Sequence, residues 1–214
     1  MTTSRNGSYV WITWLSKLMA GDTQCQWGAW FKAHHTEYKK APSDFPRALW
    51  QVEHTKTLNE LCDECKPNAV SMFKENQNKF TLKRGRMAIA GQPDLIVLDK
   101  LNNFTIYDVK TGQPRQSDII QVLLYMACLR YMPLYKNKQL SGCVVYKVNR
   151  TPIPATAADE TFNGQIKHFL NILDSECPPP KLPSHAECCY CEITSEDCHD
   201  RIENNETQCA DLPF

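Results

Sequence analysis

The feature that most constrains the fold is a run of β-type residues from Phe104 to Lys110 that ends in an acidic, an apolar and a basic residue. Side chains alternate between the two faces of a β-strand, so Asp108 and Lys110 share one face, about 7 Å apart along the strand. Val109 then points the other way, into a core. We therefore expect a sheet that packs on a core with one face and presents this polar pair to a cleft with the other.

The residues around this strand have the donor atoms that phosphodiester hydrolysis requires. Asp94 lies about one hairpin upstream, and hard divalent cations such as Mg²⁺ or Mn²⁺ prefer oxygen ligands. A bound cation lowers the pKa of its water and neutralises charge in the transition state. Asp94 and Asp108 are candidate ligands, and the backbone carbonyl of Val109 is a third. Lys110 can orient or activate the water.

A helix follows this strand. The apolar pattern predicts it from Ser117 to Met132, with Ser117 or Asp118 capping its start. Gln121 and Tyr125 are four residues apart and share one helix face. A buried Gln needs a hydrogen-bond partner, which a metal-bound water or a phosphate would supply. Taken alone, the pair is better explained by a Gln at the rim and a Tyr in the core.

Together these elements resemble the PD-(D/E)XK nuclease superfamily, and within it the RecB-type branch. The pattern of that branch is Gly-x-Pro-Asp, then Asp-x-Lys, then Gln-x-x-x-Tyr, which corresponds to Gly91–Asp94, Asp108–Lys110 and Gln121–Tyr125. The branch also has a histidine on an upstream helix that joins the metal site. His54 is the natural match, because His34 and His35 lie too close to the N-terminus.

The resemblance implies an α/β (α+β) fold of the restriction-endonuclease-like kind, with an αβββαβ core and a mixed central sheet. It implies a metal-dependent deoxyribonuclease, and we expect an exonuclease that acts on single-stranded DNA ends. The ligands of Mg²⁺ or Mn²⁺ would be His54, Asp94, Asp108 and the carbonyl of Val109. Lys110 would position or activate water, while Gln121 and Tyr125 would support the site or contact the strand.

Cysteines crowd the C-terminal end of the chain. The sequence has 11 of them, an odd number, and shows neither a secretory leader nor a stretch long enough to span a membrane. We therefore expect a reducing, cytoplasmic compartment in which cysteines bind metal. Cys188, Cys191 and Cys198 place three thiols in one short loop, which can hold a metal ion or one face of a cluster.

The resemblance supplies a fourth cysteine. In RecB-type nucleases with an iron–sulfur cluster, which include AddB-like proteins and the CRISPR-associated exonucleases that trim new spacers, one cysteine lies near the N-terminus. Cys25 occupies that position. The ligands of a [4Fe–4S] cluster would be Cys25, Cys188, Cys191 and Cys198. The resemblance thus implies one nuclease domain over residues 1–214, with a core at 41–175 and an iron–sulfur lobe made by 1–40 with 176–214.

Zinc is the alternative at these cysteines. One zinc site would use Cys62, Cys65, Cys188 and Cys191. Another would be completed by His199 beside Cys198, and Cys189 could replace Cys188 as a ligand. If the cluster forms instead, Cys62 and Cys65 lie on one half-buried helix face. The remaining cysteines inside predicted elements, Cys128 and Cys143, are then core residues.

The balance of charge does not by itself indicate a nucleic-acid-binding protein. Lys plus Arg and Asp plus Glu both number 24, so binding would depend on local basic clusters. Residues that could line a phosphate track are Lys79, Lys83, Arg84, Arg86, Lys110 and Arg115, with Lys32, Lys39 and Lys40 on the N-terminal flank. For any single one of them, a solvated surface position is the commoner role. Four of the five Trp precede residue 31; we expect them to pack the N-terminal lobe, and one or two could stack on unpaired bases.

The expected order of elements follows the superfamily. A helical lobe to about Lys40 precedes a long helix that starts near Asp44 and ends around Lys66. The later elements are strands near Phe80–Ala88, Leu95–Leu98 and Phe104–Lys110, the helix Ser117–Met132, a strand near Cys143–Val148 and a helix near Asp159–Leu173.

Other functional classes remain possible on these residues. One is a catalytically inactive module that binds DNA ends or a partner, against which the intact acidic and basic pattern argues. The other is a zinc-stabilised interaction protein. The resemblance also suggests a CRISPR integrase complex as a partner besides DNA, with no role for a membrane. A nuclease of DNA repair or of a mobile element fits equally.

Overall fold

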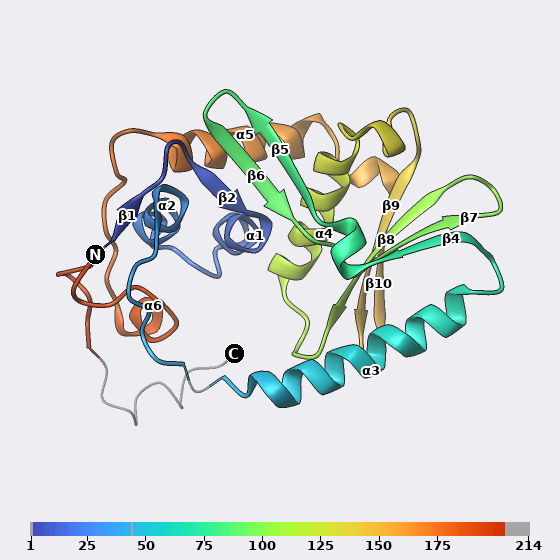
Figure 1. Ribbon diagram of the computed structural model, residues 1–214, viewed down its shortest axis with the longest axis horizontal. Coiled ribbons are helices and arrows are strands. Elements are labelled where there is room, and N and C mark those ends of the chain that lie inside the picture. Colours follow the sequence, from blue (N-terminus) through green and yellow to red (C-terminus); the bar gives the residue numbers. More distant parts are fainter. Residues whose placement is uncertain (1, 44, 204–214) are drawn as a thin grey trace.

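A five-stranded mixed sheet forms the centre of the computed structural model, which describes residues 2–43 and 45–203 (Figure 1). The strands, in the order in which they lie, are β10 (Arg150–Ile153), β9 (Leu140–Tyr146), β8 (Phe104–Lys110), β7 (Leu95–Asp99) and β4 (Ala69–Lys74). β8 and β9 run parallel, and the other neighbours are antiparallel. A parallel pair needs a crossover connection, which is the helix between β8 and β9.

Two helices cover the two faces of this sheet. α3 (Arg47–Cys65) lies along one face, where its Leu58 and Leu61 pack with Val97. α4 (Gln116–Leu129) covers the other face, in the same cluster as Ile96 and Ile106. Ile96 and Val97 are neighbours in β7, so the alternation of the strand divides them between two cores. The order α3-β4-β7-β8-α4-β9 is the predicted αβββαβ core, and the predicted fold class is confirmed.

A second, smaller sheet joins the N-terminal segment to the core. Its order is β2 (Tyr9–Trp11), β6 (Met87–Gly91) and β5 (Phe80–Arg84), with β2 parallel to β6. The single strand predicted near Phe80–Ala88 is therefore wrong. The segment is a hairpin that turns at Gly85, whose φ of +60° is a conformation that glycine adopts without strain. The first strand of the core is β4, which the sequence pattern did not indicate.

The helical lobe expected at the N-terminus consists of α1 (Ile12–Ala20) and α2 (Gln26–His34). α1 ends at Gly21, which has φ of +79° and donates its N–H to the carbonyl of Leu18 at 3.1 Å. α1 packs on α4, and α2 packs on α5 (Glu160–Asp174), whose first turn is capped by the side chain of Asp159. The remaining elements are β1 (Thr3–Ser4), β3 (His35–Thr36), α6 (His185–Cys189) and the 3₁₀ turns Glu75–Asn78, Pro133–Tyr135 and Ala155–Ala157.

Several helix limits differ from the sequence-based expectation by a few residues. The start of α3 near Asp44 cannot be compared, because Asp44 lies outside the described residues; the described helix begins at Arg47. It ends at Cys65, close to the expected position. α4 begins at Gln116, and Asp118 is in its first turn, where its carboxylate accepts the N–H of Arg115 at 3.2 Å. None of the described helices has the length and apolar character needed to cross a membrane.

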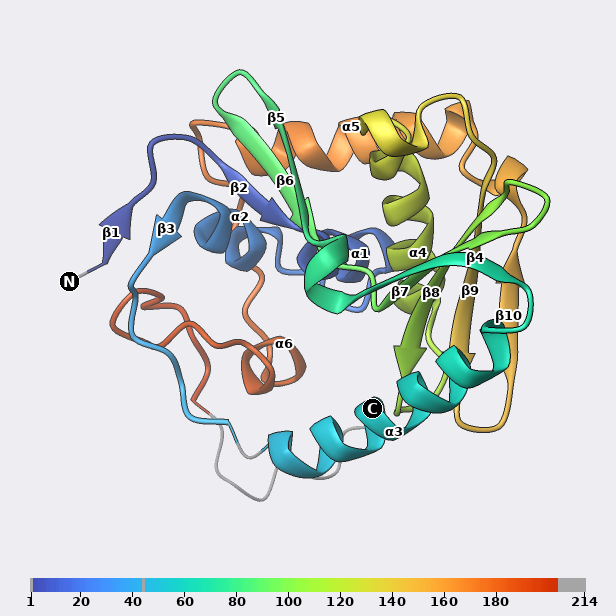
Figure 2. The ribbon, with the colours of Figure 1, turned by 45° about the vertical axis from the view of Figure 1, so that its right-hand side comes forward.

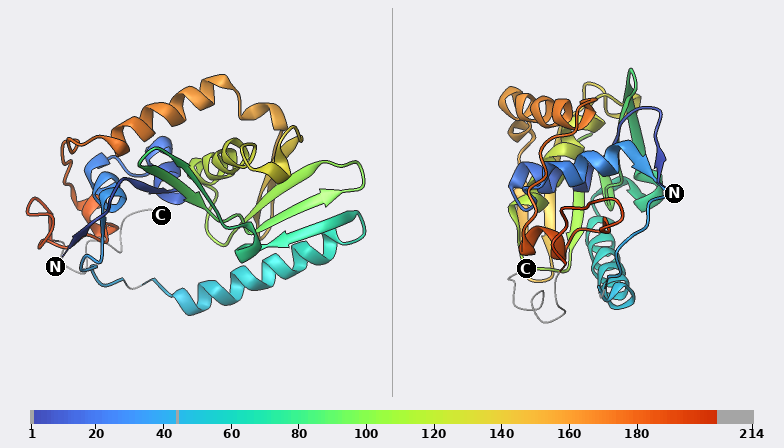
Figure 3. Two further views of the ribbon diagram at one scale, coloured as in Figure 1. Left: turned by 45° about the horizontal axis from the view of Figure 1, so that its top comes forward. Right: turned by 90° about the vertical axis from the view of Figure 1, so that its left-hand side faces the viewer.

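The two ends of the described chain lie against each other (Figures 2 and 3). Tyr38 donates its hydroxyl hydrogen to Glu192 at 2.7 Å, and Thr2 donates to Asp197 at 2.6 Å. The carboxylate of Glu187 accepts the backbone N–H groups of Gln24 and Cys25. These contacts place the cysteine-rich C-terminal segment beside the start of α2.

Candidate active site

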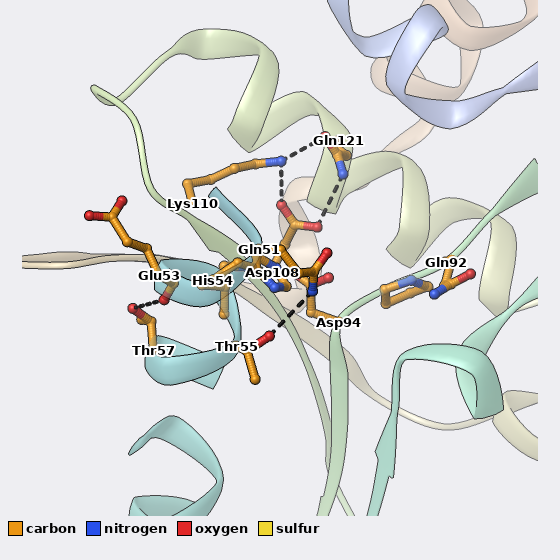
Figure 4. Close-up of polar contacts among 12 residues, drawn as sticks. Gln51, Glu53, His54, Thr55, Thr57, Gln92, Asp94, Asp108, Lys110 and Gln121 are labelled. Carbon is orange, nitrogen blue, oxygen red and sulfur yellow. Dashed lines mark hydrogen bonds and ion pairs between the residues drawn. The ribbon is translucent and has the colours of Figure 1, made fainter. Parts of the chain in front are cut away.

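The polar pair of β8 faces one side of the sheet, as the strand period predicts. Lys110 Nζ lies 2.8 Å from Asp108 Oδ2 (Figure 4). The side chain of Val109 is buried in the opposite core. Asp94 comes just before β7, the antiparallel neighbour of β8. Its Oδ2 accepts the N–H of Val109 at 2.7 Å, which fixes the carboxylate next to β8. Two carboxylates and a lysine thus meet at the ends of two adjacent strands.

Gln121 connects these groups from α4. Its Nε2 donates to Asp108 Oδ1 at 3.1 Å and to the Tyr125 hydroxyl at 3.0 Å, while its Oε1 accepts from Lys110 Nζ at 3.0 Å. The Tyr125 hydroxyl in turn donates to the carbonyl of Gln92 at 3.3 Å. Gln121 is buried, so it is not the rim residue that the pair alone suggested. The network engages both N–H groups and the oxygen of its amide, and it orients Asp108 and Lys110 together.

His54 reaches the site from α3. Its Nε2 lies 3.2 Å from Asp94 Oδ2, and Trp50 stacks on its ring with the centroids 5.0 Å apart. His34 and His35 instead stack on aromatic residues of the N-terminal lobe. Of the three histidines considered from the sequence, His54 is the one that the structure brings to the acidic pair.

Burial and charge oppose each other in this site. The pKa of Asp108 is raised to about 6, because burial and the charge of Asp94 together outweigh the opposing effect of Lys110. Burial lowers the pKa of Lys110, but Asp108, Asp118 and Asp94 together outweigh it and the net shift is upward. The hydrogen bond with Asp94 raises the pKa of His54. A cation placed between the carboxylates would favour their charged forms.

The donor set fits a hard divalent cation. Asp108 Oδ2 is buried and makes no hydrogen bond, although Lys110 lies beside it, and His54 Nδ1 is also buried and unbonded. Asp108 Oδ2 therefore has lone pairs available to a cation. Across residues 2–43 and 45–203, however, no three His, Cys, Asp or Glu side chains are already arranged around one metal position. Instead, Lys110 lies against Asp108 and His54 against Asp94, the two carboxylates that would bind it.

Two acidic residues near the site were missed in the sequence. Asp118 Oδ1 lies 3.8 Å from Lys110 Nζ, and its Oδ2 accepts the Tyr146 hydroxyl at 3.0 Å. The charge of Glu75, in the turn after β4, raises the pKa of His54. Asp118 had a detectable signal, because residues 118, 121 and 125 repeat at the helical period on one face. Glu75 had none, because its position depends on a strand that was not predicted.

The four cysteines proposed as cluster ligands gather around one open pocket of about 870 Å³, at the start of α2 and along the C-terminal segment. Burial raises the pKa of Cys191 and of Cys198, and the nearby Cys25 raises both pKa values further. Cys62 and Cys65 lie elsewhere, against β7 and β8 in the core under α3. The zinc site that would have combined these two with Cys188 and Cys191 is therefore wrong, because the fold separates the pairs.

A comparison with protein-family models agrees with this architecture. A family model described as the PD-(D/E)XK nuclease superfamily matches residues 21–198, which include every residue placed in the two sites above. Among solved structures, the chain is similar to one titled "Crystal structure of SSO0001", with 15% sequence identity and a TM-score of 0.44 over 87% of this chain and 84% of that chain. No curated protein gives a significant match.

Proposed function

The chain belongs to the PD-(D/E)XK nuclease superfamily, and we propose that it is an exonuclease acting on the ends of single-stranded DNA. Membership of this superfamily implies a metal-dependent nuclease that uses divalent ions such as Mg²⁺ or Mn²⁺ and acts on DNA. The observation that supports activity in this chain is the buried network in which Gln121 bonds both Asp108 and Lys110. An inactive binding module would not require a network that holds a carboxylate and an ammonium group together.

We assign the metal ligands to His54, Asp94, Asp108 and the carbonyl of Val109. When bound, the ion would lower the pKa of water and neutralise charge on the scissile phosphate. Lys110 Nζ is then placed to orient the attacking water or to stabilise the charge that develops. Gln121 holds Lys110 and Asp108 in position, and the bond from Tyr125 to the Gln92 carbonyl fixes α4 against the loop that carries Asp94.

The exonuclease activity is tested by comparing linear with circular substrates. We expect Mn²⁺- or Mg²⁺-dependent shortening of linear single-stranded DNA labelled at either end, and no loss of a circular single strand of the same sequence. The released products should be mononucleotides or short oligonucleotides from the first time point. Rapid linearisation of the circle would show an endonuclease and contradict the proposal.

We assign a [4Fe–4S] cluster to Cys25, Cys188, Cys191 and Cys198, with zinc as the alternative. Their position around one pocket supports this, as does the N–H of Ile202, which lies 3.4 Å from Cys188 Sγ. Such N–H donors are common around cluster sulfurs. The cluster would tie residues 1–40 to 176–214, beside the core at 41–175.

Metal analysis of protein purified without oxygen tests the cluster. We expect iron and acid-labile sulfide in the wild type, and loss of both in Cys25→Ala. Cys177→Ala is the matched control, because Cys177 is exposed and is not among the assigned ligands. Zinc without sulfide would favour the alternative, and a Cys25→Ala protein with its full metal content would contradict the ligand assignment.

A role in CRISPR spacer processing, with an integrase complex as partner, rests on the resemblance of the cysteine and motif pattern alone. A nuclease of DNA repair or of a mobile element would use the same site. Trimming of single-stranded overhangs on spacer-length duplexes, stimulated by the integrase, is the result expected for the CRISPR role.

A further inference from the structure

Three basic side chains line the pocket of the four cysteines without a neutralising partner. They are Lys17 on α1, Lys32 on α2 and Arg115 just before α4. Among the described residues, none of the three forms an ion pair, whereas Lys39 and Lys40 on the outer surface pair with Glu196 and Glu192. Two other basic residues that line the pocket, Lys181 and Arg201, pair with Asp200 and Glu203, so within the described part of the chain Lys17, Lys32 and Arg115 are the pocket's basic residues without an ion pair.

The acids of the pocket are mostly engaged elsewhere. Glu187 accepts two backbone N–H groups of the N-terminal segment, and Glu192 accepts hydrogen bonds from Tyr38 and Lys40. Asp22 raises the pKa of Lys17 but lies beyond ion-pair distance from it. Glu192 also attracts Lys32 without forming an ion pair with it, but five Lys and Arg against three Asp and Glu line the pocket among the described residues, so its net charge is positive.

The positive side chains act on one another and lead to the catalytic lysine. The pKa of Lys17 is lowered, first by burial and then by Arg115, and Lys110 contributes in the same direction. The pKa of Lys32 is lowered by burial; Glu192 and Cys191 oppose this shift, and Lys17 adds to it. Like charges held close together are unfavourable until an anion lies between them. Arg115 connects this pocket with the active site, because its backbone N–H donates to Asp118 Oδ2 at 3.2 Å and Asp118 Oδ1 lies 3.8 Å from Lys110 Nζ.

An aromatic residue accompanies this path. Trp14 lines the same pocket, and Lys32 Nζ lies 5.0 Å from the centre of its ring. A basic groove with an aromatic side chain is the combination that binds single-stranded nucleic acid, since phosphates pair with the cations and bases stack on the rings. The pocket is a concavity between α1, α2 and the C-terminal segment, which a flexible single strand can enter.

We propose that this pocket, defined by Lys17, Lys32, Arg115 and Trp14, binds the single strand adjacent to the bond that is cut. The three basic side chains contact phosphates, and Trp14 contacts a base. The proposal rests on the proposed function, because it extends the substrate away from the nuclease site toward the cysteine lobe. It assigns the helical lobe to substrate binding as well as to holding the cluster.

The test measures binding of a fluorescent oligothymidylate to the full-length protein by anisotropy, in chelator so that no cleavage occurs, across a range of salt concentrations. For a single strand, each phosphate contact contributes a slope of about −0.7 in log K against log salt, or about five-fold in affinity at 0.1 M salt. Lys17→Ala with Lys32→Ala should therefore weaken binding about 25-fold and reduce the slope by about 1.4. The control is Lys136→Ala with Lys167→Ala, two exposed lysines outside the pocket, which should change neither quantity.

Each outcome separates the pocket from the nuclease itself. Replacement by Arg, which keeps the charge, should restore binding, and the unfolding midpoint of every variant should match the wild type. If the wild type cuts linear single strands and the double variant keeps the wild-type affinity and salt slope, the pocket does not bind the strand, and the proposed function still holds. An equal loss of duplex binding would overturn the assignment to a single strand. Wild-type protein that neither binds nor cuts DNA would contradict the proposed function.

Discussion

Replacing Gln121 by leucine tests the network that holds the nuclease site. Leucine has a similar volume but removes three hydrogen bonds, to Asp108, Lys110 and Tyr125. Lys110 keeps its ion pair with Asp108, and Tyr125 keeps its bond to the Gln92 carbonyl. Asp108 Oδ1 loses the hydrogen bond from Gln121 Nε2, the one side-chain donor that it has among the described residues.

The cost follows from that one unsatisfied oxygen. Asp108 is only 2% exposed, so water cannot replace the lost donor. Leaving a buried acceptor unbonded costs about 1–3 kcal/mol, with charged groups at the upper end, so we expect a loss of about 2–3 kcal/mol in the free energy of unfolding. For a chain of this size that lowers Tm by about 4–12 °C. Loss of a supporting contact of a metal ligand should reduce the cleavage rate about 10–100-fold.

Thermal unfolding and single-turnover cleavage of a labelled single strand measure the two effects. Gln165→Leu is the matched control, because Gln165 is exposed on α5 and far in sequence from the site. We expect it to retain the wild-type rate. If Gln121→Leu unfolds and cleaves like the wild type, then the network neither supports the fold nor positions Lys110, and the reasoning fails.

Two further predictions concern stability. Gly142→Ala would place a Cβ 2.3 Å from Val122 Cγ1 and should destabilise the protein by about 1–3 kcal/mol in urea unfolding. Gly164→Ala, at a helical position with no atom within 4 Å of the new Cβ, should instead stabilise it by up to about 1 kcal/mol. Equal effects of the two substitutions would contradict the packing of α4 on β9. Burial raises the pKa of Glu192, but hydrogen bonds from Lys40 and Tyr38 outweigh it and the net shift is downward. Its stabilising contribution is then complete above the unfolded pKa and is lost as pH falls through the folded value. The stability difference between wild type and Glu192→Gln should thus be constant near pH 6–7 and shrink below about pH 4.5, and a difference independent of pH would refute it.

The elements with a strong local pattern were predictable. β8 matches its expected limits because its alternation is regular, and α4 matches within a few residues because its apolar face is continuous. The same regularity identified Asp108, Lys110 and Gln121 as members of one site. Their approach to Asp94 followed from the hairpin between β7 and β8, which is a local connection.

The elements that depend on distant partners were not predictable. β2 is three residues long and owes its existence to pairing with β6, far along the chain. The hairpin of β5 and β6 was read as one strand because Gly85, which allows the turn, was the only sign of it. Likewise, nothing in the spacing of Cys25 joins it to the C-terminal cysteines; the resemblance alone suggested it, and contacts such as that of Glu187 with its N–H bring the two ends together.

The basic residues of the N-terminal flank show why the sequence could not predict which lysines are paired with acids. Lys32, Lys39 and Lys40 looked alike as a basic N-terminal flank. In the fold, Lys39 and Lys40 are paired with acids of the C-terminal segment, whereas Lys32 is half-buried in the pocket and forms no ion pair with any described residue. Pairing is decided by the approach of a segment more than 150 residues later in the chain, which no local pattern contains.

The most direct test of the central claim is cleavage of end-labelled single- and double-stranded DNA by wild type and Lys110→Ala, each with Mn²⁺, Mg²⁺ or chelator. Lys136→Ala serves as the control for loss of an exposed lysine. We predict metal-dependent shortening by the wild type and the control, none in chelator, and none by Lys110→Ala even though it still binds DNA. Cleavage by Lys110→Ala at the wild-type rate would contradict the placement of the active site on β8.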